Sequence, residues 1–142
     1  MSIVKSSEPG RKILIVDDEQ ALINVMADQF TKEDFTVITA QNGEEGLEYA
    51  LRDHPDLIVL DITMPVMNGY SMLEKLRQDN WGSKVPVMIL TNRDDAVNIS
   101  AMMNSKHINK YFIKADNKLD DIAREIKDML PVIQRTYPVN QA

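Results

Sequence analysis

The sequence predicts an α/β fold in which a doubly wound, five-stranded parallel sheet is covered by helices on both faces. Five short runs of aliphatic and β-branched residues alternate with five segments whose apolar residues recur at helical spacing. The strand runs are apolar almost throughout, which is typical of strands that are buried on both faces of a parallel sheet. With right-handed crossovers, five such units fit the strand order 2-1-3-4-5, in which the first and third strands are neighbours.

The first strand and helix are followed by a second pair of the same kind. Residues 12–16 form a continuous apolar run, and apolar residues then recur at helical spacing over residues 22–30. Residues 35–40 are rich in β-branched and aromatic side chains, which favours a strand. Asn42 is a suitable helix N-cap, and Glu45 three residues later completes the pattern of a capping box.

The second half of the chain continues the alternation. Residues 57–60 are four aliphatics in a row, and residues 68–79 carry apolar side chains at helical spacing. We expect a fourth strand over residues 85–90, a helix over residues 94–105 and a fifth strand over residues 107–113. A last helix follows, because its apolar residues form one stripe: Leu119, Ile122, Ala123, Ile126 and Leu130.

The sequence predicts a single domain over residues 12–130. Residues 1–11 are polar and contain Ser, Pro and Gly, so we expect a flexible leader there. Residues 131–142 would form a C-terminal tail that is too short for a DNA-binding or catalytic output domain. The chain is therefore expected to be either a stand-alone unit or a piece of a longer protein.

Composition excludes several classes of function. The net charge of −6 argues against a large basic surface for direct nucleic-acid binding. The chain has no cysteine, which removes disulfides, thiolate metal sites and cysteine nucleophiles. No apolar run approaches the ~18 residues that span a bilayer, and the N-terminus lacks a signal-peptide core. We therefore expect a cytoplasmic protein without membrane insertion.

Polar and charged residues stand at the carboxyl ends of four predicted strands. Asp17 and Asp18 follow the first strand, Asp61 the third, Thr91 the fourth and Lys114 the fifth. In open α/β sheets, ligands bind beyond these ends, where the winding reverses direction. Because the first, third and fourth strands are neighbours in the predicted order, we expect the three aspartates and the threonine to converge.

The charges of these residues indicate that the site binds a cation and, together with that cation, a phosphoryl group. Two carboxylates 4–5 Å apart repel by roughly 4 kcal/mol at an effective dielectric constant near 20. A set of oxygen ligands without nearby His or Cys favours a hard ion, Mg²⁺ or Mn²⁺. With such an ion, Asp61 is a candidate nucleophile for phosphoryl transfer. Lys114 and the ion would neutralise the phosphoryl oxygens, and Thr91 would donate a hydrogen bond.

These residues resemble the receiver domain of two-component response regulators. The resemblance covers residues 12–130 and rests on Asp17-Asp18, the segment DITMPVMNG that starts at Asp61, Leu90-Thr91 and the segment YFIK that ends at Lys114. The acidic pair and the lysine are weak signals alone, but together, in order and with the Met-Pro…Gly loop, they are strong. The resemblance implies a flavodoxin-like fold and a signalling switch. It implies no enzyme beyond catalysis of the chain's own phosphorylation and dephosphorylation.

The resemblance also implies roles for the acidic residues. Asp61 would accept phosphate from a phosphohistidine on a sensor histidine kinase or a phosphotransfer protein. Asp18, Asp61 and the backbone carbonyl of Thr63 would bind Mg²⁺ directly, and Asp17 would reach the ion through water. On phosphorylation Thr91 would move toward the phosphoryl group and Tyr111 would swing inward. The surface formed by the last two helices and the fifth strand would then change and bind a downstream protein.

Two backbone features follow from the same resemblance. Pro65 and Gly69 would shape the loop beside the metal, Pro65 through its fixed φ and Gly69 through a positive φ. The family usually has a cis proline after the lysine, whereas Ala115 follows Lys114 here. A cis bond before a non-proline residue costs ~2.5–4 kcal/mol. We nevertheless expect the geometry of the site to favour cis at this bond.

Two other functions stay open at this point. A receiver-like scaffold that takes no phosphate would have the same fold, and treatment with acetyl phosphate and Mg²⁺ would distinguish it. A Mg²⁺-dependent phosphatase with an aspartyl nucleophile resembles Asp-x-Asp at the nucleophile, the second acid being the proton donor. Thr63 occupies that second position, so the phosphatase is the weaker alternative.

Overall fold

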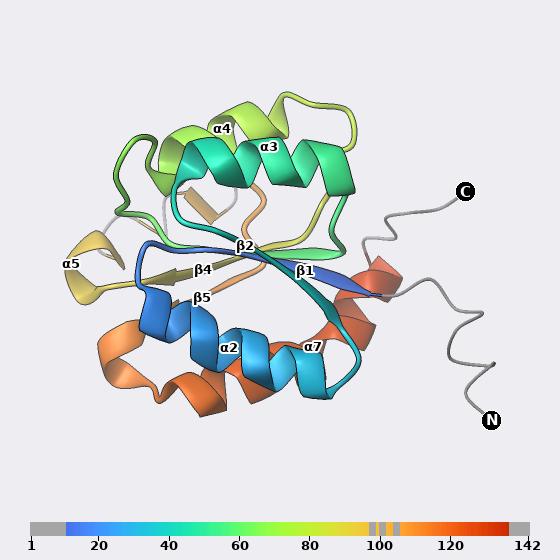
Figure 1. Cartoon of the computed structure of the whole chain (residues 1–142). Helices are drawn as coiled ribbons and strands as arrows, with labels where there is room; N and C mark the ends of the chain where they lie inside the picture. Colours follow the sequence, from blue (N-terminus) through green and yellow to red (C-terminus); the bar gives the residue numbers. More distant parts are fainter. Residues whose placement is uncertain (1–10, 97–98, 100–101, 104–105, 137–142) are drawn as a thin grey trace.

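The computed structural model is a three-layer α/β domain in which α3 and α4 cover one face of the sheet and α2 and α7 cover the other (Figure 1). The structure describes residues 11–96, 99, 102–103 and 106–136. The elements in chain order are β1 (Lys12–Val16), α2 (Gln20–Lys32), β2 (Thr36–Ala40), α3 (Gly43–Asp53), β3 (Leu57–Leu60), α4 (Gly69–Arg77), β4 (Val87–Thr91), α5 (Arg93–Ala96), β5 (Lys110–Ile113), a 3-10 helix (Lys114–Asp116) and α7 (Leu119–Thr136).

The five strands are parallel and lie in the order β2-β1-β3-β4-β5, which confirms the predicted fold class and strand order. Val16 at the end of β1 pairs with Leu60 at the end of β3. The backbone N–H of Asp61 donates to the carbonyl of Val16 at 2.9 Å, which continues this pairing by one residue. The residues that follow β1 and β3 therefore leave the sheet at the same level.

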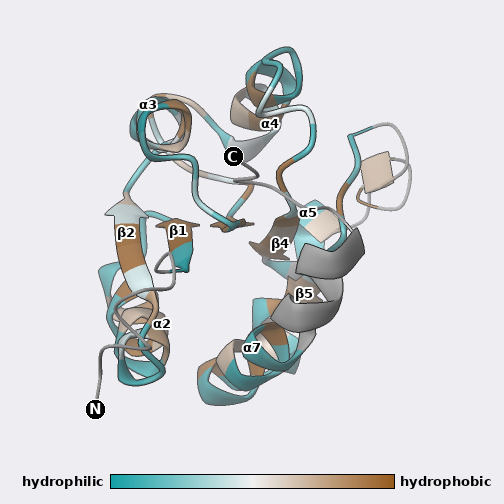
Figure 2. Ribbon diagram, turned by 90° about the vertical axis from the view of Figure 1, so that its right-hand side faces the viewer, coloured by the Kyte–Doolittle hydropathy of each residue, from teal (hydrophilic) through white to brown (hydrophobic). Residues whose placement is uncertain are grey.

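The sheet separates two apolar cores because successive strand side chains point to opposite faces. On one side Ile13 and Ile15 pack with Met26 and Phe30 of α2 and with Ile126 of α7. On the other side Leu14 and Val16 pack with apolar residues of α3 and α4, among them Ala50, Met72, Leu73 and Leu76. Figure 2 shows the apolar strands between helices whose outer sides are hydrophilic. The helix stripes expected from the sequence account for this packing.

The predicted N-terminal cap of α3 is confirmed. The side chain of Asn42 accepts a hydrogen bond from the backbone N–H of Glu45 at 2.9 Å. The side chain of Glu45 in turn accepts from the backbone N–H of Gln41 at 3.1 Å. Asn68 caps α4 in the same way, through the backbone N–H of Ser71 at 2.9 Å. These bonds satisfy N–H groups that have no partner within the helix.

Two strands begin two or more residues later than the sequence predicts. β4 begins at Val87 and not at Val85, and Pro86 between them has no N–H with which to enter the ladder. β5 begins at Lys110 and not at His107. His107 has a φ of 55° and lies in a turn, a conformation that no strand residue adopts.

The two C-terminal helices also differ from prediction. The helix expected over residues 94–105 begins with α5 at Arg93–Ala96, and most of its remainder lies outside the described residues. α7 continues to Thr136, although we predicted a tail from residue 131. A proline removes one helical hydrogen bond and kinks a helix, but Pro131 does not end this one. Residues 1–10 of the predicted leader lie outside the described part of the chain. No helix in that part is long and apolar enough to cross a membrane.

An aromatic contact joins two loops at the amino ends of the strands. His54 ends α3 in the left-handed region, with a φ of 47°. Its ring stacks on the indole of Trp81, with ring centroids 4.2 Å apart and planes 8° from parallel. Arg77 stabilises the same end by donating to the carbonyls of Gly82 and Val85 at 2.8 and 2.7 Å. This end of the molecule lies opposite the carboxyl ends of the strands.

Candidate functional site

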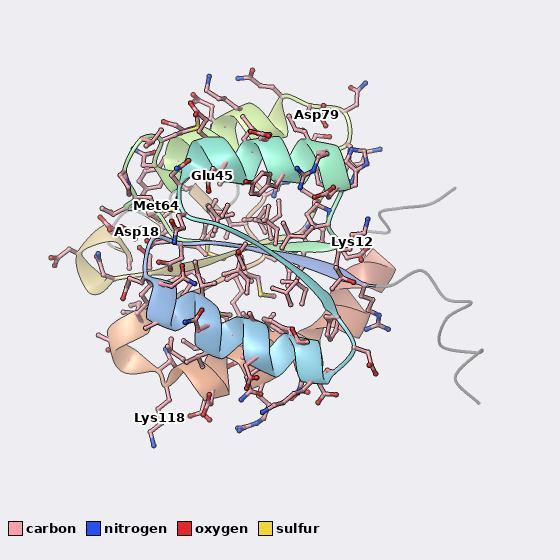
Figure 3. The ribbon with its side chains drawn as sticks, viewed as in Figure 1. Lys12, Asp18, Glu45, Met64, Asp79 and Lys118 are labelled. Carbon is pink, nitrogen blue, oxygen red and sulfur yellow. The ribbon has the colours of Figure 1, made fainter. Side chains whose placement is uncertain are left out.

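The sequence-predicted residues meet at the carboxyl edge of the sheet. The N–H of Asp17 donates to the carbonyl of Ala40 at 3.0 Å, and that of Asp61 donates to Val16, so both aspartates are fixed by neighbouring strands. Figure 3 shows Asp18 at this edge of the sheet, with Lys12 at the opposite one. One carboxylate oxygen from each of Asp17, Asp18 and Asp61 lies within 4.8 Å of the other two. The predicted convergence of three carboxylates is therefore present.

The carboxylate cluster is buried where it meets the sheet and open to solvent on its outer side. Asp17 and Asp61 are 1 % and 4 % exposed, whereas Asp18 is exposed to solvent. Lys114 reaches in from the end of β5, with its Nζ 2.9 Å from Asp17 Oδ2 and 3.7 Å from Asp61 Oδ2. The site thus holds three carboxylates against one ammonium group, an arrangement that accepts a further cation.

Glu19 is a site residue that the sequence analysis missed. Its Oε1 lies 2.5 Å from Lys114 Nζ, and its backbone N–H donates to Asp17 Oδ1 at 2.9 Å. The available signal was a third acid directly after the Asp17-Asp18 pair. A side chain in that place projects from the start of α2 toward the same edge of the sheet.

Burial dominates the acid–base properties of the cluster. It raises the pKa of Asp61 to about 7, with a further increase from the negative charge of Asp17, while Lys114 and the N–H of Ile62 act in the opposite direction. Burial also raises the pKa of Asp17, against the N–H of Glu19 and Lys114. Burial lowers the pKa of Lys114, but its bonds to Glu19 and Asp17 outweigh that effect and raise it to about 12. In the absence of a metal, Asp61 therefore binds a proton far more readily than an ordinary aspartate.

Thr91 ends β4, the strand next to β3 in the sheet. It is fully buried, and its hydroxyl has no hydrogen-bond partner within the described part of the chain. A buried polar group without a partner costs about 1–3 kcal/mol. The role of this hydroxyl as a hydrogen-bond donor to a phosphoryl group stays a prediction.

The loop after Asp61 needs Gly69 for a reason other than the one predicted. None of the described glycines has a positive φ, so the expectation for Gly69 is wrong. A Cβ on Gly69 would instead lie 2.2 Å from the backbone oxygen of Asp61, which no side chain tolerates. The loop is closed by bonds from Gly69 N–H to Ile62 O and from Met67 N–H to Pro65 O, both 2.7 Å long. Val66 within the second of these has a φ of 66°.

Three remaining predictions have different outcomes. Thr63 is exposed and its hydroxyl donates to Asp95 at the start of α5, and the role of its carbonyl as a metal ligand stays a prediction. Tyr111 is half-buried against the core on the α4 side of the sheet. The Lys114–Ala115 bond is trans, as are all peptide bonds of the described residues, so the cis prediction is wrong. Lys114 begins a 3-10 helix, and its side chain contacts Asp17 with this peptide bond in the trans form.

The donor set fits Mg²⁺ or Mn²⁺. It consists of carboxylate oxygens, with no His nearby and no cysteine in the chain. Hard divalent cations prefer such oxygens, and Mg²⁺ is typically held by one or two carboxylates with other positions left for water and phosphate. The raised pKa of Asp61 shows that the folded chain disfavours its negative charge, which a divalent cation would stabilise.

The fold and the site together define a class of domain with an acidic, lysine-containing pocket at the switch point of a parallel sheet. The chain belongs to the response regulator receiver domain family, whose model matches residues 13–127. Receiver domains of this family are signalling switches of two-component systems, phosphorylated on an aspartate.

Curated relatives share this domain as part of longer proteins. The chain is 38 % identical over 86 residues to the alkaline phosphatase synthesis transcriptional regulatory protein PhoP of Bacillus subtilis, with 61 % of this chain and 35 % of that protein covered. It is 39 % identical over 83 residues to the response regulator PleD of Caulobacter vibrioides, with 58 % of this chain and 18 % of that protein covered. The chain thus spans about a third or less of the length of these relatives.

Solved structures show the same fold. A CheY-like receiver domain protein from Methanospirillum hungatei has a TM-score of 0.78 and 23 % identity, with 90 % of this chain and 99 % of that chain covered. The receiver domain of the sensor histidine kinase PA1611 from Pseudomonas aeruginosa, solved with a magnesium ion in its active site cleft, has a TM-score of 0.72 and 24 % identity, covering 87 % and 99 %.

Proposed function

We propose that the chain is a phosphoacceptor switch and that Asp61 is the residue that takes the phosphoryl group. The carrying observation is the position of Asp61, a buried carboxylate at the end of β3 that lies beside two further acids and 3.7 Å from the ammonium of Lys114. A carboxylate in such surroundings has few uses in a stable core, because burial raises its free energy. It becomes useful when a cation and an anionic group join it.

The reaction forms one bond and breaks one. An oxygen of deprotonated Asp61 attacks the phosphorus of a phosphohistidine, and the P–N bond breaks with its electron pair going to the nitrogen, so that the imidazole leaves as a neutral ring with the proton that its other nitrogen already carried. Lys114 pairs with the phosphoryl oxygens and the free hydroxyl of Thr91 donates to one of them. Asp17, Asp18, Asp61 and the carbonyl of Thr63 would hold Mg²⁺, which supplies positive charge for the transferring group.

The switch would connect the phosphoryl group to a protein surface. Thr91 and Tyr111 lie on neighbouring strands, with Thr91 opposite Ile113 and Tyr111 opposite Ile89. A movement of Thr91 toward the phosphoryl group would leave space that the half-buried Tyr111 can enter. The surface of α5, β5 and α7 would change with it and bind a downstream protein, without direct contact to nucleic acid.

The partners follow from this role. The phosphoryl donor would be a sensor histidine kinase or a histidine phosphotransfer protein, and the setting would be the cytoplasm. Curated relatives that include transcriptional regulators carry the matching domain as about a third of their length. The output of this chain would depend on the protein or domain to which its switch surface binds.

The test uses acetyl phosphate, whose phosphoryl group passes to Asp61 as acetate leaves. Wild type with Mg²⁺ should gain the mass of one phosphoryl group in intact-protein mass spectrometry, and Asp61→Asn should gain none. Glu44→Gln, which removes an exposed acid of α3 at the same sheet edge, should behave as wild type. No gain on wild type would favour the receiver-like scaffold, and continuous release of phosphate from a generic phosphomonoester would favour the phosphatase.

A further inference from the structure

Lys114 is shared by three carboxylates, and its shortest contact leads away from Asp61. Its Nζ lies 2.5 Å from Glu19 Oε1, 2.9 Å from Asp17 Oδ2 and 3.7 Å from Asp61 Oδ2. The side chain of Glu19 is 60 % exposed, whereas those of Asp17 and Asp61 are 2 % and 5 % exposed. The ammonium group therefore lies between a buried acidic cluster and an acid on the surface.

The backbone of Glu19 fixes this arrangement. Glu19 is the N-cap residue of α2, and its side chain makes no capping hydrogen bond. Its backbone N–H donates to Asp17 Oδ1 at 2.9 Å, and its carbonyl accepts from Ile23 N–H at 3.1 Å. An acid at a helix N-cap commonly accepts from the first N–H groups of its helix. The Glu19 carboxylate binds Lys114 in place of that bond.

We propose that Glu19 is a positioning residue that holds Lys114 at the Asp17 side of the carboxylate cluster and away from Asp61, so that a divalent cation can bind beside Asp61. This inference rests on the proposed function of the Asp61 site and adds a residue to it. The Lys114 ammonium and a divalent cation compete for Asp17 and Asp61. Glu19 provides the ammonium with a partner outside the cluster, from which it returns once Asp61 carries the additional negative charge of a phosphoryl group.

Loss of the Glu19 charge then has two consequences, and both weaken cation binding. One negative charge near the cation disappears, and Lys114 stays between Asp17 and Asp61 as a competing cation. The phosphoryl group is instead stabilised more strongly, because Lys114 no longer interacts with Glu19 and is free to pair with the phosphoryl oxygens. Removal of Glu19 should therefore lower Mg²⁺ affinity without slowing phosphate uptake once Mg²⁺ is saturating.

The experiment is a double-mutant cycle read by Mg²⁺ binding to the unphosphorylated chain. Titration calorimetry with magnesium chloride is applied to wild type, Glu19→Gln, Lys114→Gln and the double variant, with Glu44→Gln as the control. For Glu19→Gln we expect a Kd that is roughly three- to tenfold higher. For Glu44→Gln we expect a change of less than about twofold, because the charge is exposed and screened. In the Lys114→Gln background the effect of Glu19→Gln should become clearly smaller, because only the direct loss of one negative charge near the cation remains.

Two results would overturn the inference. The first is a change in the Kd for Mg²⁺ that is the same for Glu19→Gln as for Glu44→Gln, or that is equally large with and without Lys114. Either outcome would mean that Glu19 acts only through its charge and not through Lys114. The other is slower phosphate uptake from acetyl phosphate by Glu19→Gln at saturating Mg²⁺. Circular dichroism of each variant verifies folding. Failure of wild type to take phosphate would contradict the proposed function, while the Mg²⁺ cycle would still decide the role of Glu19.

Discussion

Lys114 Nζ and Asp61 Oδ2 lie 3.7 Å apart, beyond the length of a hydrogen bond but within range of strong attraction. The pair connects the ends of β5 and β3, with β4 between them in the sheet. A lysine at this distance lowers the energy of the Asp61 carboxylate without neutralising it. Burial and Asp17 outweigh this effect, which leaves the pKa of Asp61 at about 7. The metal-free site is therefore sensitive to pH near neutrality.

Asp61→Asn should stabilise the metal-free protein at pH 8. The folded-state pKa of Asp61 is raised above its ordinary value, so between about pH 4 and pH 7 the folded chain holds a proton that the unfolded chain has released. Stability from this group is thus full at low pH and lost as the pH rises through about 7. At pH 8 we expect a gain of roughly 2–4 kcal/mol in the free energy of unfolding.

The measurement is urea unfolding in EDTA at pH 5 and pH 8. At pH 5 the unfolded chain has already released this proton while the folded chain still holds it, so the mutant should keep roughly 40 % of its advantage at pH 8. Glu44→Gln serves as the charge control and should show no such pH-dependent gain. A loss of stability in Asp61→Asn at pH 8 would contradict the argument from burial and repulsion.

Mg²⁺ binding should weaken as the pH falls below 7. The cation must displace the proton of Asp61, which at pH 6 is present on about nine-tenths of the molecules. Between pH 8 and pH 6 the apparent Kd should rise by roughly tenfold, and the raised pKa of Asp17 acts in the same direction. Calorimetry in two buffers of different ionisation enthalpy would detect the released proton. Equal affinity at both pH values would contradict a role of Asp61 as ligand.

Thr91→Val should leave the resting protein at least as stable as wild type and remove its response to phosphorylation. The hydroxyl of Thr91 is buried and has no partner among the residues that the structure describes, so its replacement by a methyl group of similar size removes an unsatisfied polar group. We expect a gain of up to about 1 kcal/mol in urea unfolding. Phosphorylation shifts of Tyr111 in NMR spectra should disappear in Thr91→Val and persist in Thr91→Ser. Persistence in both variants would exclude the hydroxyl as the link.

Gly69→Ala should destabilise the domain and impair the site together. The new Cβ would lie 2.2 Å from the backbone oxygen of Asp61, so the loop must move. We expect a loss of roughly 2–4 kcal/mol, since overlap with backbone cannot be relieved by a side-chain rotation. Phosphate uptake should fall as well. Ser71→Ala, an exposed change two residues later, should affect neither quantity, and equal effects of the two variants would contradict the steric argument.

The sequence was sufficient for the strand order and for most of the site. Uninterrupted aliphatic strands with acids at their ends place Asp17 and Asp61 together, because parallel strands end at one edge. Glu19 was missed, because its role depends on the reach of Lys114 across the sheet, a distance that no spacing along the chain indicates. The sequence predicts that Gly69 is needed for a positive φ, whereas the structure shows that the backbone of Asp61 lies too close for any side chain. A glycine in a sequence does not distinguish these two reasons.

Two further features could not be predicted from the sequence, namely the peptide bond after Lys114 and the C-terminal end of α7. The cis prediction came from the family's proline, but Ala115 leaves the bond free to adopt the less costly trans form. The predicted end of the last helix at residue 130 lies directly before Pro131, and proline is a frequent helix boundary. That rule states a preference, and neighbouring packing decides each case.

The stacked pair His54 and Trp81 gives the protein a built-in optical probe. The indole is the only one in the chain, and it lies at the amino ends of the strands, away from the acidic cluster. Its emission should therefore follow separation of the two rings when the domain denatures and remain almost constant when ions or phosphate bind. Fluorescence can thus measure melting independently of site occupancy, without an added dye.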